Sequence, residues 1–231
     1  MITPILNLER QADTLARAQR HWQEQVHTAR RAKPTYSVTI SREAGADGAT
    51  IAAEVANRLG WPVYDRELIE RIAREMGLRT NLVQAVDEHR KSWLLECVEA
   101  FTSAVTLSES KFVRYLVETL LSLSTLGHCV IVGRGASQVL PAASTLRVRL
   151  VGAKEDRIGT IQRRMHLLPD QAAKWVDDTD RERAAFVKDH FFKDPADSSL
   201  YDLVLNTSRW TAGDCADLII DALKKLEMRT P

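Results

Sequence analysis

The chain reads YSVTISREAGADGATIAAEVANRLG from Tyr36 to Gly60. Its first five residues are largely β-branched or aromatic and come shortly after Pro34, which is typical of a buried strand. Small residues then form a loop, and the segment from Thr50 to Leu59 has apolar residues at helical spacing. Gly60 can adopt the left-handed conformation that ends a helix. A strand, a glycine loop and a helix in this order offer backbone amides to a phosphate.

The loop departs from the usual phosphate loop, because no register of Ser41–Thr50 supplies the lysine of G-x-x-x-x-G-K-[ST]. The glycines are equally compatible with a turn that needs them for geometry alone. Arg42 is the nearest cation, and we hypothesise that it supplies the charge of the absent lysine. A salt bridge from Arg42 to Glu43 or Asp47 is an equally open interpretation.

Strands and helices alternate along the rest of the chain, which predicts a parallel sheet with helices on both faces. Thr179 and Glu182 have capping-box spacing, which predicts that a helix begins there with Asp180–Arg183 in its first turn. Ligands of such sheets bind beyond the carboxyl ends of the strands. The remaining expected elements are extended segments at 61–64, 129–132, 146–151 and 202–206, and helices after Asp65, across 80–126, from about 154 and over 213–228.

Composition excludes several protein classes. The 231 residues suffice for one medium domain with an appendage, and a formal net charge of +1 argues against a general polyanion-binding surface. Any phosphate chemistry should therefore be local. The N-terminus has only a brief apolar start followed by dense charge, so it matches neither a secretory signal nor a membrane span, and we expect a cytoplasmic protein. The cysteines, Cys97, Cys129 and Cys215, lie far apart and are expected to be buried and reduced.

The segment before Pro34 predicts a helical arm, since residues 4–32 contain no glycine and have apolar residues at loose helical spacing. It would pack on the domain or on a second copy of the chain. Nucleic-acid binding by its arginines is disfavoured because acidic residues are interspersed.

Five segments in this order along the chain resemble the cytidylate kinase-like family, a branch of the P-loop nucleoside monophosphate kinases. They spread over most of residues 36–220, and their order makes coincidence a poor explanation. The resemblance implies a kinase-like P-loop domain over 35–231, with a helical insert at about 80–126 and the arm of 1–34 outside it. The matching segments are Thr39–Gly48, Pro62–Leu68, Val130–Ala136, Glu155–Arg157 and Leu200–Thr207.

On the donor side, the resemblance implies that the loop wraps the phosphates of ATP and that Thr50 meets Mg²⁺. Relatives commonly read Gly-Ser-Gly-Gly-Arg where this chain has Gly45-Ala-Asp-Gly-Ala49. Asp47 therefore brings a carboxylate toward phosphate, at a cost of about 1–4 kcal/mol unless Mg²⁺ or an arginine intervenes. Ala49 removes a substitute cation. The residues expected to bind the donor are Ser41, Gly45, Ala46, Asp47, Gly48, Ala49 and Thr50.

On the acceptor side, the resemblance implies binding of CMP or dCMP by five residues, of which Asp180 and Arg183 lie one helical turn apart. A solvated surface ion pair between these two is an open alternative. Arginines suit phosphate because the planar guanidinium donates two parallel hydrogen bonds. The expected substrate-binding residues are Asp65, Arg66, Arg134, Asp180 and Arg183, and the expected catalytic residues are Arg42 together with the lid arginines Arg157, Arg163 and Arg164.

Three functions follow from these expectations. The first is an ATP- and Mg²⁺-dependent kinase for CMP or dCMP, which acts through positioning and electrostatics. The second is a catalytically weak or inactive nucleotide-binding relative with a regulatory role, which Asp47 and the missing lysine favour. The third is an interaction protein that forms a homodimer through the arm or the long helices, and this role could accompany either of the others.

Overall fold

The computed structural model describes residues 35–67, 69 and 109–229. The arm predicted for 1–34, the part of the predicted helical insert before Glu109, and Cys97 lie outside these residues. Among the described residues, no helix is both long enough and apolar enough to cross a membrane. The elements are β1 (Ser37–Arg42), α2 (Gly48–Leu59), β2 (Val63–Tyr64), α5 (Glu109–Leu126), β3 (Cys129–Val132), α6 (Ala136–Val139), η2 (Ala142–Ser144), β4 (Thr145–Val151), α7 (Lys154–Met165), α8 (Pro169–Phe191), η3 (Ser198–Leu200), β5 (Leu203–Asn206) and α9 (Ala212–Arg229).

The chain divides into two compact units, and all five strands belong to the unit formed by Tyr36–Arg66, His128–Gln138 and Thr145–Pro231. Its sheet has the order β2-β3-β1-β4-β5, and every pairing is parallel. β1 lies at the centre, between β3 and β4. The predicted α/β fold with a parallel sheet is confirmed.

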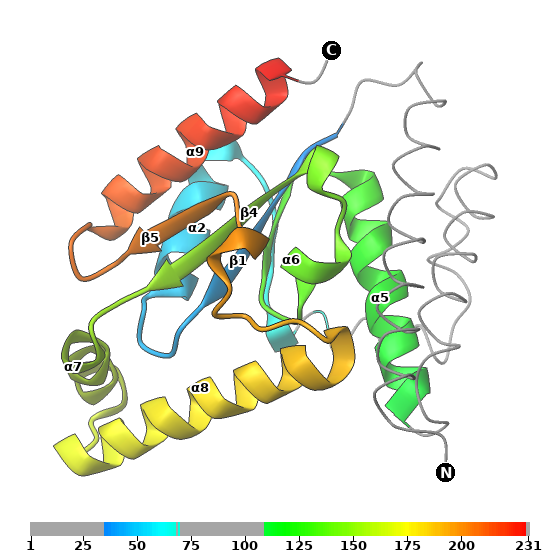
Figure 1. The fold of residues 1–231 in the computed structure, drawn as a ribbon. Helices are drawn as coiled ribbons and strands as arrows, with labels where there is room; N and C mark the ends of the chain where they lie inside the picture. The colour runs from blue at the N-terminus through cyan, green and yellow to red at the C-terminus, as the bar shows by residue number, and fades with distance from the viewer. Residues whose placement is uncertain (1–34, 68, 70–108, 230–231) are drawn as a thin grey trace, which may run out of the picture. The chain divides into compact units, whose positions relative to one another are not determined.

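Helices α2 and α9 pack against each other and against the sheet (Figure 1). The apolar face expected for α2 is confirmed, since Ile51 and Val55 are buried in the core and Leu59 packs at its edge. Burial of such a side chain stabilises the fold by about 1.5–3 kcal/mol. Gly60 ends α2 in the left-handed conformation, with φ 68°, as its position after the periodic segment predicts.

Helices α7 and α8 pack against each other near the carboxyl ends of β1 and β4 (Figure 1). The acidic first turn expected for α7 is present in Glu155 and Asp156. The helix start predicted at Thr179 is wrong, because α8 begins at Pro169 and Thr179 lies inside it. The Gln171 side chain accepts the backbone N–H of Leu168 at 3.1 Å and so satisfies the real helix start.

The other unit contributes α5 and η2 to the described residues. The helix expected before residue 127 is confirmed over Glu109–Leu126, and Leu116 and Leu120 on it are buried. Cys129 and Cys215 are buried, as expected for core residues.

Candidate functional site

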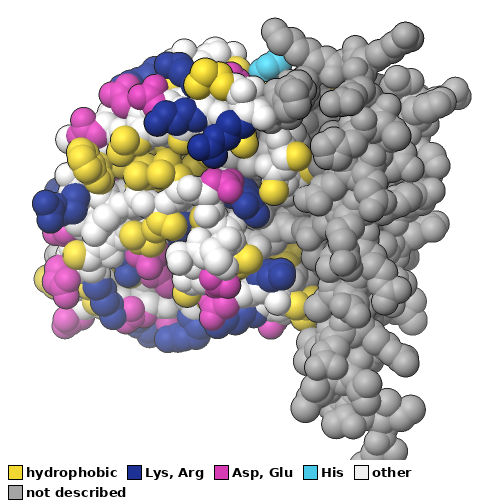
Figure 2. Space-filling model, turned by 45° about the horizontal axis from the view of Figure 1, so that its top comes forward, with side chains coloured by type: hydrophobic (Ala, Val, Ile, Leu, Met, Phe, Trp, Pro, Cys, Tyr) yellow, Lys and Arg dark blue, Asp and Glu magenta, His cyan; other side chains and the backbone are white. Residues whose placement is uncertain are grey.

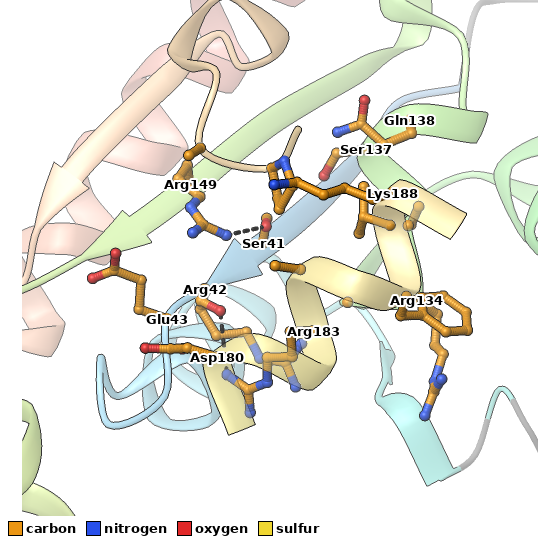
Figure 3. A pocket seen from close by; sticks show the side chains of 18 of the residues that line it. Ser41, Arg42, Glu43, Arg134, Ser137, Gln138, Arg149, Asp180, Arg183 and Lys188 are labelled. Atoms are coloured by element: carbon orange, nitrogen blue, oxygen red, sulfur yellow. Dashed lines mark hydrogen bonds between the residues drawn. The ribbon is translucent and has the colours of Figure 1, made fainter. Parts of the chain in front are cut away.

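The larger cavity of the sheet-containing unit lies beyond the carboxyl ends of β1, β3 and β4 and has a volume of about 530 Å³. The end of β1 lines it with Ser41 and Arg42, and the turn after β3 lines it with Gly133–Gln138. Helix α8 and Arg149 of β4 contribute further charged side chains (Figure 3). The cavity is therefore at the strand ends where the sequence predicts a ligand.

Three arginines of this cavity have no carboxylate partner among the described residues, and two of them hydrogen-bond to neutral groups. Arg149 donates from Nη1 to Ser41 Oγ at 2.8 Å, and Arg183 donates from Nη1 to the Arg42 carbonyl at 3.2 Å (Figure 3). The Arg42 side chain passes Gly48 and ends against Gly133, where a Cβ would lie 2.2 Å from its Nη1. None of these three arginines forms an ion pair with any residue that the structure describes.

The arginines of the cavity are close enough to affect one another's ionisation. Burial, and after it the nearby charges of Arg183, Arg134, Arg66 and Arg149 in that order of importance, together lower the pKa of Arg42 to about 9. Burial also lowers the pKa of Arg183. With a pKa of about 9, Arg42 remains protonated at neutral pH. The cavity therefore concentrates positive charge, and Arg42, Arg149 and Arg183 in it form no ion pair with a described residue, which suits an anion site.

This charge is local to the cavity. Figure 2 shows lysines and arginines interspersed with aspartates and glutamates over the described part of the face in view, in agreement with the net charge of +1. Inside the cavity, the guanidinium of Arg134 stacks 4.7 Å from the ring centroid of Phe186, which fixes its direction.

A second cavity, of about 260 Å³, adjoins the glycine loop. It lies between the loop, α7 and the segment after β5, to which Thr207, Ser208 and Trp210 belong. The backbone N–H groups of the first turn of α2 have no acceptor within the helix. Gly45 has φ 79° and packs so closely on the backbone of Arg157 that a Cβ would lie 2.4 Å from its carbonyl oxygen. Open amides beside a small cavity fit a phosphate.

Asp47 is neutralised by residues of the chain itself. Its backbone is left-handed, with φ 55°, at the N-cap of α2, and its Oδ1 accepts the Thr50 hydroxyl at 3.0 Å. Arg164, from the last turn of α7, donates to the same oxygen and forms an ion pair with it. An arginine thus intervenes at the carboxylate that the family resemblance leads us to expect beside the donor phosphates.

Asp180 and Arg157 both hydrogen-bond to the backbone of Ala44 at the start of the loop. Asp180 accepts the backbone N–H of Ala44 at 2.7 Å and the Nη1 of Arg157 at 2.6 Å. Arg157 also donates to the Ala44 carbonyl at 2.9 Å, and its side chain is only 10% exposed. Glu43 pairs with Arg157 at 3.3 Å. A nearly buried arginine bound in this way by two half-buried carboxylates holds the loop against α7 and α8.

The structure decides between two sets of alternatives that the sequence leaves open. The predicted proximity of Asp180 and Arg183 is confirmed, but both bind backbone groups next to the loop and do not form a surface ion pair with each other. The alternative salt bridges of Arg42 are contradicted, because Glu43 pairs with Arg157 and Asp47 with Arg164.

Most of the predicted site residues line one of the two cavities. The larger cavity is lined by the predicted residues Ser41, Arg42, Arg66, Arg134, Asp180 and Arg183, and the second by Gly45, Asp47, Arg157 and Arg163.

The remaining predicted residues line neither cavity in the described structure, and each has a defined place. Ala46 is fully buried in the hydrophobic core, and Gly48, Ala49 and Thr50 form the first turn of α2. Asp65 directly precedes helical residues at Arg66 and Glu67.

Sequence reasoning missed Arg149, Lys188, Phe186 and Tyr201, which also line the larger cavity. A signal for Arg149 was present. In β4 the arginines alternate with buried Val148 and Leu150, so a charged row lies on one face of a strand near its carboxyl end. Lys188, Phe186 and Tyr201 carry no comparable local signal.

The comparisons with known proteins concern the family and the fold. The model of the cytidylate kinase-like family matches residues 37–209. A cytidylate kinase from Methanopyrus kandleri is 24% identical over 194 residues, which are 82% of this chain and 93% of that protein. Among solved structures, an uncharacterized protein from Eubacterium ventriosum has a TM-score of 0.57 at 17% identity, covering 82% of this chain and 98% of that one. A shikimate kinase from Bacteroides thetaiotaomicron has a TM-score of 0.47 at 16% identity, covering 82% and 99%.

Proposed function

This chain belongs to the cytidylate kinase-like family, and we propose that it is a nucleoside monophosphate kinase that transfers the γ-phosphoryl group of ATP to CMP or dCMP. The observation that carries the proposal is the larger cavity, where Arg42, Arg149 and Arg183 lack carboxylate partners among the described residues. The phosphate of a nucleoside monophosphate would supply the missing negative charge. Arg66 and Arg134 line the same cavity and would contribute further donors.

The donor would bind at the loop beside the second cavity. The open amides at the start of α2 would hold its phosphates, and its nucleoside would lie toward Thr207, Ser208 and Trp210. Thr50 would contribute its hydroxyl to Mg²⁺, which neutralises phosphate charge when bound. Among the described residues, no cluster of three His, Cys, Asp or Glu side chains is arranged to hold a metal ion.

The reaction needs little covalent chemistry from the protein. A phosphate oxygen of the acceptor attacks the γ-phosphorus, the bond to the β,γ-bridging oxygen breaks, and ADP leaves. The chain would act by alignment and by positive charge around the transferring group. Arg42 suits this second task, because its side chain runs from Gly48, the first residue of α2, to Gly133 in the larger cavity.

The proposal is tested by ADP release in a coupled assay across CMP, dCMP, UMP and AMP, together with thermal unfolding in the presence of each nucleotide. We expect turnover with CMP or dCMP above that with UMP and AMP. Equal turnover with all four would retain the kinase and reject the base preference. Absence of turnover with every acceptor would reject the kinase activity.

Arg149 offers a prediction on the acceptor side. We expect Arg149→Met to raise the KM for the acceptor by roughly 10- to 100-fold, because a hydrogen bond to a charged group contributes about 1.5–3 kcal/mol. Arg147→Met is the matched control, since Arg147 lies on the same strand but pairs with Asp202 at 2.8 Å. An equal rise in KM for both variants, measured by steady-state kinetics at saturating ATP, would contradict a specific role for Arg149.

A second candidate function is a nucleotide-binding relative without significant turnover, with a regulatory role. The specific observation in its favour is Asp47, whose carboxylate stands in a loop that contains no lysine. This second function predicts that nucleotides raise the melting temperature but that no ADP is released. The cytoplasmic location and the homodimer through 1–34 or 80–126 stay predictions.

A further inference from the structure

The part of the glycine loop that follows Ala44 has no cation of its own. From Gly45 to Thr50 the one charged side chain is that of Asp47, and it stands at the N-terminus of α2, where open amides favour an anion. An uncovered carboxylate at this place would repel the phosphates of a donor nucleotide. The chain therefore needs a positive charge near Asp47 if the loop is to bind a triphosphate.

Arg164 provides that charge from a distant part of the sequence. It donates to Asp47 Oδ1, which also accepts the Thr50 hydroxyl at 3.0 Å. The side chains of Arg164 and Asp47 are 48% and 40% exposed, so their ion pair is accessible to a ligand. Because exposed pairs contribute little to stability, a phosphate can compete for this guanidinium at small cost.

Helix α7 explains why Arg164 stays beside the loop. Arg157 lies two helical turns before Arg164 and so projects from the same face. It is nearly buried, donates to the Ala44 carbonyl at 2.9 Å, and packs its backbone on Gly45. Arg157 in the first turn of α7 thus binds the start of the loop at Ala44. Arg164 in the last turn of α7 lies beside Asp47.

We propose that Arg164, held by Asp47, supplies the donor-phosphate charge that the loop itself lacks. Asp47 is a positioning residue: it keeps the guanidinium at the loop before nucleotide arrives, and Arg164 then shares its hydrogen bonds with the phosphates. This inference rests on the proposed function, since it concerns how the same loop binds ATP. In this proposal, Arg164 compensates for the lysine that the usual phosphate loop has and this loop lacks.

The test is a double-mutant cycle with Arg164→Gln, Asp47→Asn and the double variant, read out by calorimetric binding of a non-hydrolysable ATP analogue with Mg²⁺. We expect R164Q to weaken binding by at least about 10-fold, because it removes the cation and uncovers the carboxylate. D47N should weaken binding by no more than about 3-fold, because Arg164 remains. The double variant should bind at least about 3-fold more tightly than R164Q, since the repulsive charge is gone.

The control is Arg181→Gln, which removes an exposed arginine that pairs with Asp178 on α8. It should leave the affinity unchanged within about 2-fold. The proposal is overturned if R164Q binds the analogue as tightly as the wild type, or if the two substitutions change the affinity independently of each other. In either case, binding of the analogue by the wild type would still support a nucleotide site. If the wild type fails to bind the analogue, both this proposal and the proposed function fail. Thermal unfolding of each ligand-free variant identifies any loss of affinity that comes from misfolding.

Discussion

Arg42→Met is expected to lower kcat by about 10³-fold while raising the melting temperature of the ligand-free protein. The loss of rate follows from the position of Arg42 between the loop and the larger cavity, because an arginine at a transferring phosphoryl group contributes roughly 10³-fold or more. The gain in stability follows from charge repulsion. Arg42 lies among Arg183, Arg134, Arg66 and Arg149 with no ion-pair partner among the described residues.

Met is the appropriate replacement because it keeps an unbranched stem where Arg42 packs against Gly48 and Gly133. A gain of about 1–2 kcal/mol in the free energy of unfolding corresponds to roughly 2–8 °C for a chain of this size. Inorganic phosphate should stabilise the wild type more than the variant, because the wild type has the more positive cavity. A variant that retains kcat within 10-fold, or is less stable than the wild type without anions, would contradict this interpretation.

The pH dependence of stability gives an independent check on Arg42. Its pKa is lowered from the ordinary value of an arginine to about 9 in the folded protein, so above about pH 9 the unfolded chain binds more protons at this group than the folded chain does. For this group, stability therefore rises as pH increases through about 9. Arg42→Met lacks this gain, so its advantage over the wild type should shrink between pH 8 and pH 10. Urea unfolding of both proteins at the two pH values measures the difference, and other titrating groups largely cancel.

Local sequence patterns predict the fold well because each element here satisfies its own requirements. The β-branched segment at β1, the periodic residues of α2 and Gly60 at its end act over a few residues, and each takes the expected structure. The capping-box pattern at Thr179 failed for an equally local reason. No glycine or proline interrupts the chain between Asp170 and Thr179, so the helix that begins at Pro169 continues through the pattern.

The candidate site was predicted only in outline. Position after a strand identified the loop and the turn after β3, since the carboxyl ends of parallel strands meet at one edge. The pairing of Asp47 with Arg164 and of Ala44 with Asp180 joins residues separated by 117 and 136 positions. No periodicity connects residues so far apart. Their contacts depend on how α7 and α8 pack at the strand ends, which is a property of the folded chain.

Asp180→Asn is expected to lower the free energy of unfolding by about 2–4 kcal/mol, because it deprives the nearly buried Arg157 of its closest carboxylate. The amide can still accept one hydrogen bond, but it cannot neutralise the guanidinium. For a chain of this size the melting temperature should fall by roughly 4–16 °C, as measured by calorimetry. Asp178→Asn on the same helix is the control, since its partner Arg181 is 75% exposed and the pair contributes about 0–1 kcal/mol.

The two roles of Asp180 predict different outcomes for this substitution. If Asp180 holds the loop through Ala44 and Arg157, the Asn variant loses stability, and ATP and acceptor binding weaken together, because the loop start becomes loose. If Asp180 instead reads the acceptor base, as the family resemblance implies, the preference for CMP over UMP changes while the melting temperature stays near that of Asp178→Asn. Both results would appear only if the carboxylate alternates between the loop and the larger cavity, which Asp180 also lines. Measuring acceptor preference and unfolding on the same variant therefore assigns the residue to the loop, to the substrate or to both.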